Sequence, residues 1–296
     1  MSLVRRLGKA TAITMIAGTV GGAALLAAEA LAARTRRYAQ PDLRLAMRTS
    51  VGEDGVPLRL VLLGDSTALG VGVGRVGDTV GGRLAELLAE QAGTGVAGRG
   101  PLAGTDSAGV AGRRPLAGAG SAGVAGDGRR VELSSVAVHG SRSADLATQV
   151  ARALLGPTPD VAVILVGAND VVGLRRPGEA AAHLAAAVSR LGDAGVAVVV
   201  GTCPDLGAAR AIAQPLRQLV ALQARRMARA QAAAVREAGG VPVDLAGRTG
   251  AVFRADAGTL CEDRYHPSAD GYRVWAHALL PAVVEAARLR TAATEE

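Results

Sequence analysis

Short apolar runs rich in β-branched residues alternate along most of this chain with longer runs whose apolar residues repeat at helical spacing. Strands are predicted over the short runs, which are residues 58–63, 131–138, 161–166, 196–200 and 241–245. Helices are predicted over the longer runs, which are residues 80–91, 144–155, 179–191, 211–238 and 268 to about 290. Buried strands that alternate with helices form parallel sheets with helices on both faces. The sequence therefore predicts a three-layer α/β/α fold.

Composition and charge exclude several other classes of protein. The 296 residues are 49% apolar, which is too many for a disordered chain, and two cysteines cannot form a disulfide framework. The formal net charge is +7, but six basic residues and one acid fall within residues 1–37, so the remaining 259 residues carry only +2. At 2% aromatic residues, the chain also lacks rings that could stack on single-stranded bases. We therefore expect no nucleic-acid partner.

Residues 10–28 are nineteen uncharged residues between two basic clusters. A helix that rises about 1.5 Å per residue crosses a hydrocarbon core of about 30 Å in roughly 20 residues, so this stretch is just long enough to span a membrane. We interpret residues 1–37 as a membrane anchor or a cleaved secretory signal, with a buried Ala-rich helix as the third alternative. Under the first two interpretations the protein is membrane-anchored or secreted, and the rest of the chain works outside the cytoplasm.

Two further segments lie outside the alternating pattern. Residues 38–56 are polar and mixed in charge, and they are predicted to be a linker. Residues 95–108 (GVAGRGPLAGTDSA) recur almost unchanged at 109–122. A solenoid would need more copies with larger apolar faces, so residues 93–128 are interpreted as a low-complexity insertion between the first helix and the second strand.

The first predicted strand runs directly into Gly64-Asp65-Ser66. Open parallel sheets bind ligands at the carboxyl ends of their strands, so a serine just beyond the first strand is placed for chemistry. The alternative for this short motif is a turn that caps a helix. The glycines at 72–77 match G-x-G-x-x-G, but they begin nine residues after the strand instead of in the turn that follows it. We therefore expect a loop beside the serine there, and no nicotinamide cofactor.

Asn169 and Gly140 follow the third and second predicted strands, so both are expected at the same sheet edge as the serine. The Asn169 carboxamide offers two N–H donors that can be aimed at a developing oxyanion, and its alternative role is an Asx-turn. Gly140 has no Cβ, which would let its backbone N–H approach a substrate oxygen. The two residues are therefore candidate oxyanion donors.

Asp263 precedes His266 by three residues near the C-terminus. At this spacing the carboxylate can reach imidazole Nδ1 and leave Nε2 free as a base. The other histidines are interpreted as mostly structural, although His139 is near enough to Gly140 to line the site. The remaining two lie within predicted helices, namely His183 and His277.

Together these motifs resemble the SGNH (GDSL-type) family of serine esterases and lipases. The resemblance covers roughly residues 57–290, and it rests on four blocks in the family's order, namely Gly64-Asp65-Ser66, Gly140, Gly167-x-Asn169-Asp170 and Asp263-x-x-His266-Pro267. It implies a flavodoxin-like domain with a five-stranded parallel sheet of strand order 2-1-3-4-5, followed by a tail at 291–296. The departures are His139, directly before the glycine, and the tandem insertion.

The resemblance also implies a function. Ser66, His266 and Asp263 would form a catalytic triad that cleaves carboxylic esters, with the oxyanion held by Ser66, Gly140 and Asn169. Such an enzyme needs no metal and no organic cofactor, and its expected partners are small-molecule, lipid or glycan esters and a membrane contacted through the N-terminal segment. A monomer is expected. Two alternatives stay open, namely an acyltransferase or deacetylase acting on cell-envelope sugars or lipids, and a catalytically silent surface module.

Cys203 follows the fourth predicted strand and Cys261 lies two residues before Asp263, so both are expected at the carboxyl edge of the sheet. One interpretation is a disulfide that ties the His266 loop to the sheet, provided that the domain is exported. The other is two unpaired, partly buried thiols.

Overall fold

A six-stranded sheet forms the centre of the computed structural model, which describes residues 48–52, 56–93 and 130–295. The strands are β1 Arg48–Val51, β2 Leu58–Gly64, β3 Val131–Ser135, β4 Val161–Leu165, β5 Ala197–Gly201 and β6 Val241–Val243. Their order in the sheet is β1-β3-β2-β4-β5-β6. All neighbouring pairs from β3 to β6 are parallel, whereas β1 runs antiparallel to β3 at the edge. The five parallel strands therefore have the predicted order 2-1-3-4-5.

The prediction that residues 38–56 are a linker is wrong for residues 48–51, which form β1. This strand pairs with residues 131–134 of β3. Its side chains alternate between exposed and half-buried, and the segment contains Thr49 and Val51, whose β-branched side chains favour an extended backbone. A four-residue strand at the edge of a sheet gives only a weak sequence signal, so β1 was not predicted. The observed sheet therefore has six strands where five were predicted.

Two predicted strands end two or three residues earlier in the structure, and β4 ends one residue earlier, at Leu165. β3 stops at Ser135, although Val136 and Val138 still donate backbone hydrogen bonds to the carbonyls of β2 before the chain turns at Gly140. β6 stops at Val243 because Asp244 caps the next helix, accepting a hydrogen bond from the Gly247 N–H at 2.9 Å. These endings place turns and caps, instead of strand residues, at the carboxyl edge of the sheet.

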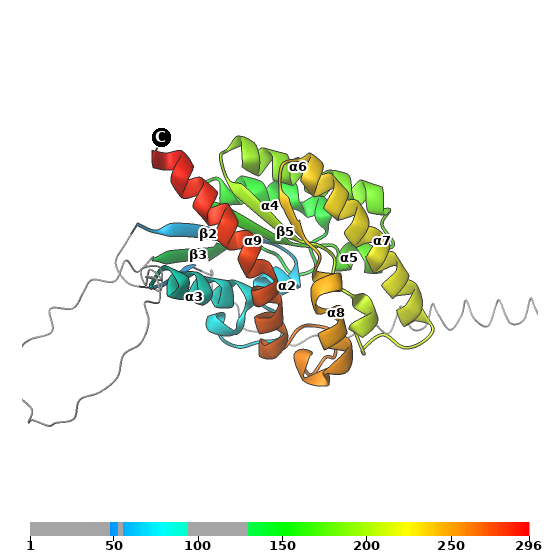
Figure 1. Ribbon diagram of the computed structural model, residues 1–296. Helices are drawn as coiled ribbons and strands as arrows, with labels where there is room; N and C mark the ends of the chain where they lie inside the picture. The colour runs from blue at the N-terminus through cyan, green and yellow to red at the C-terminus, as the bar shows by residue number, and fades with distance from the viewer. Residues whose placement is uncertain (1–47, 53–55, 94–129, 296) are drawn as a thin grey trace, which may run out of the picture.

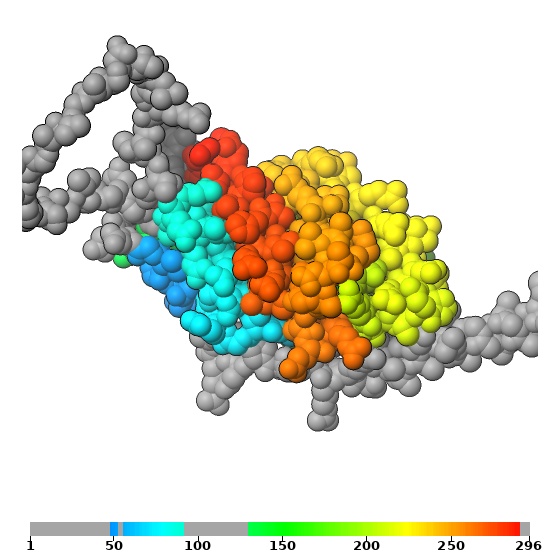
Figure 2. All heavy atoms as spheres, turned by 60° about the horizontal axis from the view of Figure 1, so that its bottom comes forward, coloured from blue at the N-terminus to red at the C-terminus, as the bar shows by residue number. Residues whose placement is uncertain are grey.

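Helices cover both faces of the sheet, as Figure 1 shows. The longer ones are α3 Val80–Gly93, α4 Leu146–Ala153, α6 Pro177–Asp193, α7 Leu216–Glu237, α8 Leu245–Ala255 and α9 Ala269–Glu295. Two are short, α2 Ser66–Leu69 and α5 Ala168–Val172, and four are single 3-10 turns, η1 Val76–Asp78, η2 Ser143–Asp145, η3 Leu206–Ala208 and η4 Ala257–Thr259. α3, α9 and α8 lie side by side on one face (Figure 2), and α4, α6 and α7 pack on the other. The predicted three-layer α/β/α architecture is confirmed.

Alternation along the strands supplies a core on each side of the sheet. In β2, Leu60 and Leu62 belong to the core beneath α3 and α9, whereas Val61 and Leu63 belong to the core beneath α4 and α6. Successive side chains of a strand point to opposite faces, so a strand buried on both faces must be apolar at every position. This burial explains why the strand runs in the sequence are continuous instead of alternating.

Three predicted segments outside the α/β core, at 1–37, 93–128 and 291–296, differ in whether the structure describes them. The predicted anchor or signal at 1–37 lies outside the described residues, and so does the insertion at 93–128 apart from Gly93, which belongs to α3. Among the described residues, no helix combines the length and the apolar character needed to cross a membrane. The prediction of a tail at 291–296 is wrong up to residue 295, because α9 continues to Glu295. The Ala and Glu residues of that stretch are strong helix formers.

Candidate active site

Ser66 stands at a sharp turn between β2 and α2. Gly64 has a φ of +130°, and a Cβ there would lie 1.8 Å from the carbonyl oxygen of Leu165 in β4, so only glycine fits. The next residue, Asp65, caps α2, since its carboxylate accepts hydrogen bonds from the N–H and the hydroxyl of Thr67 at 2.9 and 2.8 Å. Ser66 thus becomes the first residue of a helix, where backbone N–H groups have no carbonyl partner within the helix.

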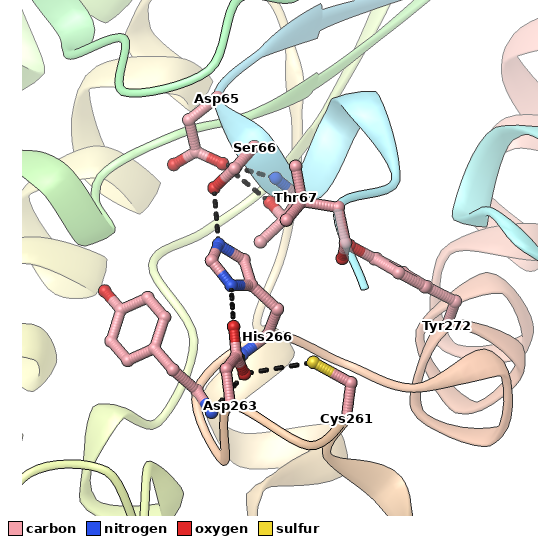
Figure 3. Close-up of polar contacts among 9 residues, drawn as sticks. Asp65, Ser66, Thr67, Cys261, Asp263, His266 and Tyr272 are labelled. Atoms are coloured by element: carbon pink, nitrogen blue, oxygen red, sulfur yellow. Dashed lines mark hydrogen bonds and ion pairs between the residues drawn. The ribbon is translucent and has the colours of Figure 1, made fainter. Parts of the chain in front are cut away.

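Ser66, His266 and Asp263 form a hydrogen-bonded chain, which Figure 3 shows. The Ser66 Oγ lies 3.0 Å from His266 Nε2, and His266 Nδ1 lies 2.6 Å from the Asp263 Oδ2. Ser66 and His266 are 5% and 2% exposed, so the contact between them is shielded from water. The structure therefore brings together residues that are 200 positions apart in the sequence, at the carboxyl edge of the sheet where they were predicted to lie.

The loop of His266 is built around the second oxygen of Asp263. Asp263 Oδ1 accepts hydrogen bonds from the backbone N–H groups of Tyr265 and His266, at 2.8 and 2.9 Å, and from Cys261 Sγ at 3.0 Å. Partial burial acts to raise the pKa of Asp263, but the hydrogen bonds from the His266 side chain, Cys261 and the two backbone groups outweigh it and hold that pKa well below its ordinary value. Asp263 is therefore ionised at neutral pH and can orient the imidazole and stabilise its cation.

Asn169 is hydrogen-bonded to the turn that contains Gly140. Gly140 has a φ of +78° in the turn closed by the hydrogen bond from Ser141 N–H to the Val138 carbonyl. Asn169 Nδ2 donates a hydrogen bond of 3.0 Å to the carbonyl of Ser141, so the carboxamide joins this turn to the start of α5. The Val171 N–H, which an Asx-turn at Asn169 would engage, donates instead to the Gly167 carbonyl at 3.0 Å, and this argues against the Asx-turn alternative. An amide has two N–H donors, and one of them is engaged here.

Two buried polar residues, whose contacts the sequence did not predict, tie these turns together. Gln149 of α4 accepts a hydrogen bond from the Gly64 N–H at 2.7 Å and donates to the Gly64 carbonyl at 2.9 Å and to Ser141 Oγ at 3.1 Å. Asp170 of α5 accepts hydrogen bonds from the N–H and hydroxyl of Ser143, at 3.0 and 2.9 Å. Gln149 lies on the apolar, buried face of α4. A polar residue in such a position indicates a buried hydrogen-bond partner, and this signal could have identified the contact with Gly64.

Aromatic rings flank His266 on two sides. The ring of Tyr265 meets the imidazole edge-on with centroids 5.1 Å apart, and the ring of His139 lies 6.4 Å away. His139 is exposed beside Gly140, as predicted for a residue that lines the site. Partial burial, and to a lesser degree the charge of a protonated His266, lower its pKa. The other two histidines are exposed on helices, namely His183 on α6 and His277 on α9.

The glycine-rich loop at 72–77 packs beside the His266 loop. A Cβ on Gly72 would lie 2.6 Å from the Pro267 carbonyl oxygen and 3.2 Å from Cys261 Sγ, so glycine permits this close approach. The loop begins at Val71, whose N–H donates to the Ser66 carbonyl and whose carbonyl accepts a 2.7 Å hydrogen bond from Tyr272. The predicted position beside the serine is therefore confirmed, and Gly72 allows the close packing against the His266 loop.

The two cysteines are not joined, so the disulfide interpretation is wrong and the thiol interpretation holds. Cys203 is fully buried, and its backbone N–H donates a 2.7 Å hydrogen bond to Gln231. Cys261 instead directs its sulfur to Asp263. Burial, followed by the hydrogen bond to Asp263, raises the pKa of Cys261 to about 11, so this thiol stays protonated and remains a donor.

Comparisons with known proteins agree with the fold and with the motifs. The family model of the GDSL-like lipase/acylhydrolase family matches residues 62–274. A GDSL-like esterase of Mycobacterium tuberculosis is 39% identical over 231 residues, which are 77% of this chain and 62% of that protein. The chain thus spans less than two thirds of the length of this curated relative.

Solved structures extend the comparison to the fold. A lipase/acylhydrolase from Enterococcus faecalis is 17% identical with a TM-score of 0.53, over 76% of this chain and 95% of that one. An acetylxylan esterase from Geobacillus stearothermophilus, solved as a catalytic mutant, is 16% identical with a TM-score of 0.51, over 78% and 95%. At such identities the likeness establishes the architecture alone.

Proposed function

This chain belongs to the GDSL-like lipase/acylhydrolase family, and on that premise we propose that it is a serine esterase that hydrolyses carboxylic esters at Ser66. The observation that carries the proposal is the chain of hydrogen bonds from Ser66 Oγ through the His266 imidazole to Asp263. Nucleophile, base and orienting acid stand in the relation that serine hydrolases require, because a hydroxyl becomes an effective nucleophile when an adjacent base can take its proton.

The first half of the reaction acylates the serine. Ser66 Oγ attacks the ester carbonyl carbon while its proton passes to His266 Nε2, and the ionised Asp263 stabilises the imidazolium that results. The carbonyl oxygen becomes an oxyanion, held by the N–H groups of Ser66 and Gly140 and by the Asn169 carboxamide. When the tetrahedral intermediate collapses, the C–O bond to the alcohol breaks and the imidazolium returns the proton to the leaving oxygen.

The second half releases the acid. A water molecule gives a proton to His266 Nε2 and attacks the acyl carbon, and a second tetrahedral intermediate forms at the same oxyanion donors. Its collapse breaks the bond to Ser66 Oγ, which regains the proton from His266. The products are a carboxylic acid and the free serine, so every atom of the reaction is supplied by the ester, water and the side chains named here.

Replacing the proposed nucleophile tests this function. Ser66→Ala should lower kcat for p-nitrophenyl acetate by at least about a thousandfold, because loss of the nucleophile in serine hydrolases removes most of the rate enhancement. Ser189→Ala, an exposed serine on α6, is the matched control and should leave kcat unchanged. Circular dichroism and thermal melting of both variants would establish that they are folded. Wild-type turnover by folded Ser66→Ala would contradict the proposal.

A further inference from the structure

His139 is an exposed ring beside the proposed base, and the reaction at Ser66 has so far given it no role. The centres of the His139 and His266 rings are 6.4 Å apart, and the ring planes are inclined by 39°. Among residues 48–52, 56–93 and 130–295, no protein group forms a hydrogen bond with the His139 side chain. An exposed ring next to the buried side chains of Ser66 and His266 can therefore contact a molecule that reaches them from solvent.

Hydrogen bonds hold the turn that carries His139. The Val138 N–H donates to the Gly64 carbonyl at 3.1 Å, and the Ser141 N–H closes the turn by donating to the Val138 carbonyl at 3.1 Å. Gly140, the proposed oxyanion donor, directly follows His139 in this turn. Because both ends of the turn are held, the His139 ring extends from a fixed backbone position next to the site of the oxyanion.

The His139 side chain is uncharged at neutral pH. Partial burial, followed by the charge of His266, lowers its pKa from the ordinary value of 6.5. A neutral imidazole has one N–H donor and one bare nitrogen that accepts a hydrogen bond, whichever tautomer is present. His139 therefore offers an acceptor beside the base.

The water that releases the acyl group has two O–H groups, and the base uses only one of them. This water occupies the place that the leaving oxygen had, beside His266 Nε2. Its second O–H also needs an acceptor, because a polar group left unpaired at a shielded site costs free energy. Two imidazole nitrogens that share one tetrahedral water at about 2.8 Å belong to rings whose centres are about 6.5 Å apart. The separation of 6.4 Å between the rings of His139 and His266 fits this arrangement.

We infer that His139 holds the water that attacks the acyl group, an inference that rests on the proposed esterase function. The first O–H proton passes to His266 Nε2 while the water oxygen bonds to the acyl carbon. The second O–H donates to the bare nitrogen of His139 and stays on the product acid. The bond from the acyl carbon to Ser66 Oγ then breaks, and Ser66 regains the proton from His266. His139 is a positioning residue, since it takes no proton and forms no bond to the acyl group.

This contact selects water over an alcohol as the acceptor of the acyl group. An alcohol has a single O–H, which the base takes, so it has no second O–H to donate to His139. Loss of the His139 acceptor should therefore slow attack by water roughly five- to tenfold, the effect of one hydrogen bond, and should change attack by an alcohol little. In this way His139 favours hydrolysis over acyl transfer at the same serine.

The partition of the acyl group between water and added methanol tests the inference, because it is decided after the acyl-enzyme has formed. His139→Leu removes the acceptor, and His139→Gln keeps an amide oxygen in a side chain of similar volume. His183→Leu, at an exposed position on α6, is the matched control. Each protein would hydrolyse p-nitrophenyl acetate at neutral pH and one methanol concentration. The readouts are the ratio of methyl acetate to acetate by NMR and the thermal melting of each variant.

The expected result is a change in the ratio of the two products. His139→Leu should raise the ratio of methyl acetate to acetate roughly five- to tenfold, and His139→Gln should stay within about twofold of wild type. His183→Leu should keep the wild-type ratio. A merely structural role of His139 in the turn of Gly140 would slow both acceptors alike and leave the ratio unchanged.

The outcomes separate the inference from the function beneath it. An unchanged ratio in folded, active His139→Leu, or equal ratios in the Leu and Gln variants, would overturn the role of His139 and leave the esterase proposal standing. A wild-type protein that forms neither acetate nor methyl acetate in a Ser66-dependent reaction would overturn the esterase proposal and the role of His139 together.

Discussion

Asp65 is the residue whose environment conflicts most with its charge. It is 2% exposed and caps α2 through the N–H and hydroxyl of Thr67, directly before the proposed nucleophile. Burial raises its pKa to about 6, although the hydrogen bonds from Thr67 act in the opposite direction. The folded protein therefore holds a proton on Asp65 at pH values where the unfolded chain, with a pKa near 3.8, has lost it.

This difference predicts a dependence of stability on pH. Because the folded-state pKa is the higher one, the stabilisation from proton binding is fully present below about pH 3.8 and is lost as the pH rises through about 6. Asp65→Asn keeps a capping oxygen and carries no charge. The free energy of unfolding of this variant, relative to wild type, should therefore increase between pH 4 and pH 7.5 by roughly 3 kcal/mol, at 1.36 kcal/mol per tenfold change in proton affinity.

Urea unfolding at both pH values measures this difference. Asp193→Asn, at an exposed position near the end of α6, is the control and should show no comparable trend. A pH-independent difference between Asp65→Asn and wild type would contradict the account of Asp65.

At the scale of single residues, the motifs predicted the polar contacts of the site well and the supporting contacts poorly. The Asp263-x-x-His266 spacing predicted the observed 2.6 Å contact between Asp263 Oδ2 and His266 Nδ1, because a carboxylate three residues before a histidine on the same loop can reach its imidazole. The hydrogen bond from Cys261 to Asp263 was not predicted, since the sequence left open a disulfide and an unpaired thiol and indicated no hydrogen-bond partner for the sulfur. Such a choice depends on where the sulfur points, which spacing along the chain does not determine.

At the scale of elements, one buried side chain of α4 connects that helix to two turns of the proposed site. Gln149 makes three hydrogen bonds, two to the backbone of Gly64 and one to Ser141, so it joins the turn before Ser66 to the turn of Gly140. Gln149→Leu keeps a similar volume but leaves the Gly64 N–H buried without its partner, whereas the Gly64 carbonyl keeps the hydrogen bond from the Val138 N–H. An unpaired buried backbone group costs about 1–3 kcal/mol, so the variant should lose roughly that much stability.

The same variant should lose activity, because the two turns would no longer share an anchor. Chemical denaturation measures the stability, and kcat for p-nitrophenyl acetate measures the positioning of Ser66. Gln223→Leu, at an exposed position on α7, is the matched control and should change neither quantity substantially. Wild-type stability and kcat in Gln149→Leu would show that the turns hold their positions without it.

At the scale of elements, the parallel strands were predictable and the edge was not. β4 is buried at every position and its sequence is a continuous apolar run, and β2 departs from this pattern only at the half-buried Arg59, so both stand out from the helices around them. β1 is four residues long and half exposed, and its partner in β3 begins 80 residues later in the chain, so no local pattern identifies it. The strand order was predicted from the resemblance to a family. The periodicity of apolar residues predicts where strands lie in the sequence, but it does not predict which strands pair in the sheet.

Across the whole molecule, the sheet brings distant parts of the chain to one edge. β2, β3 and β4 deliver Ser66, Gly140 and Asn169, and the loop before α9 places His266 over them. The two flanking cores hold this arrangement, and Tyr272 links α9 to Val71 in the loop beside the serine. The predicted membrane segment at 1–37 lies outside the described residues, so export stays a prediction from the sequence.

The central claim is that Ser66 is acylated with His266 as its base, and covalent labelling tests it most directly. The intact protein would be treated with a fluorophosphonate probe, which reacts with activated serines, and the labelled peptide would be found by mass spectrometry. We predict a single adduct on Ser66, with a labelling rate at least about a hundredfold lower in His266→Ala, because a positioned base contributes roughly 10²–10⁴ to such a step. An adduct on another serine, or equal labelling rates in wild type and folded His266→Ala, would contradict the account.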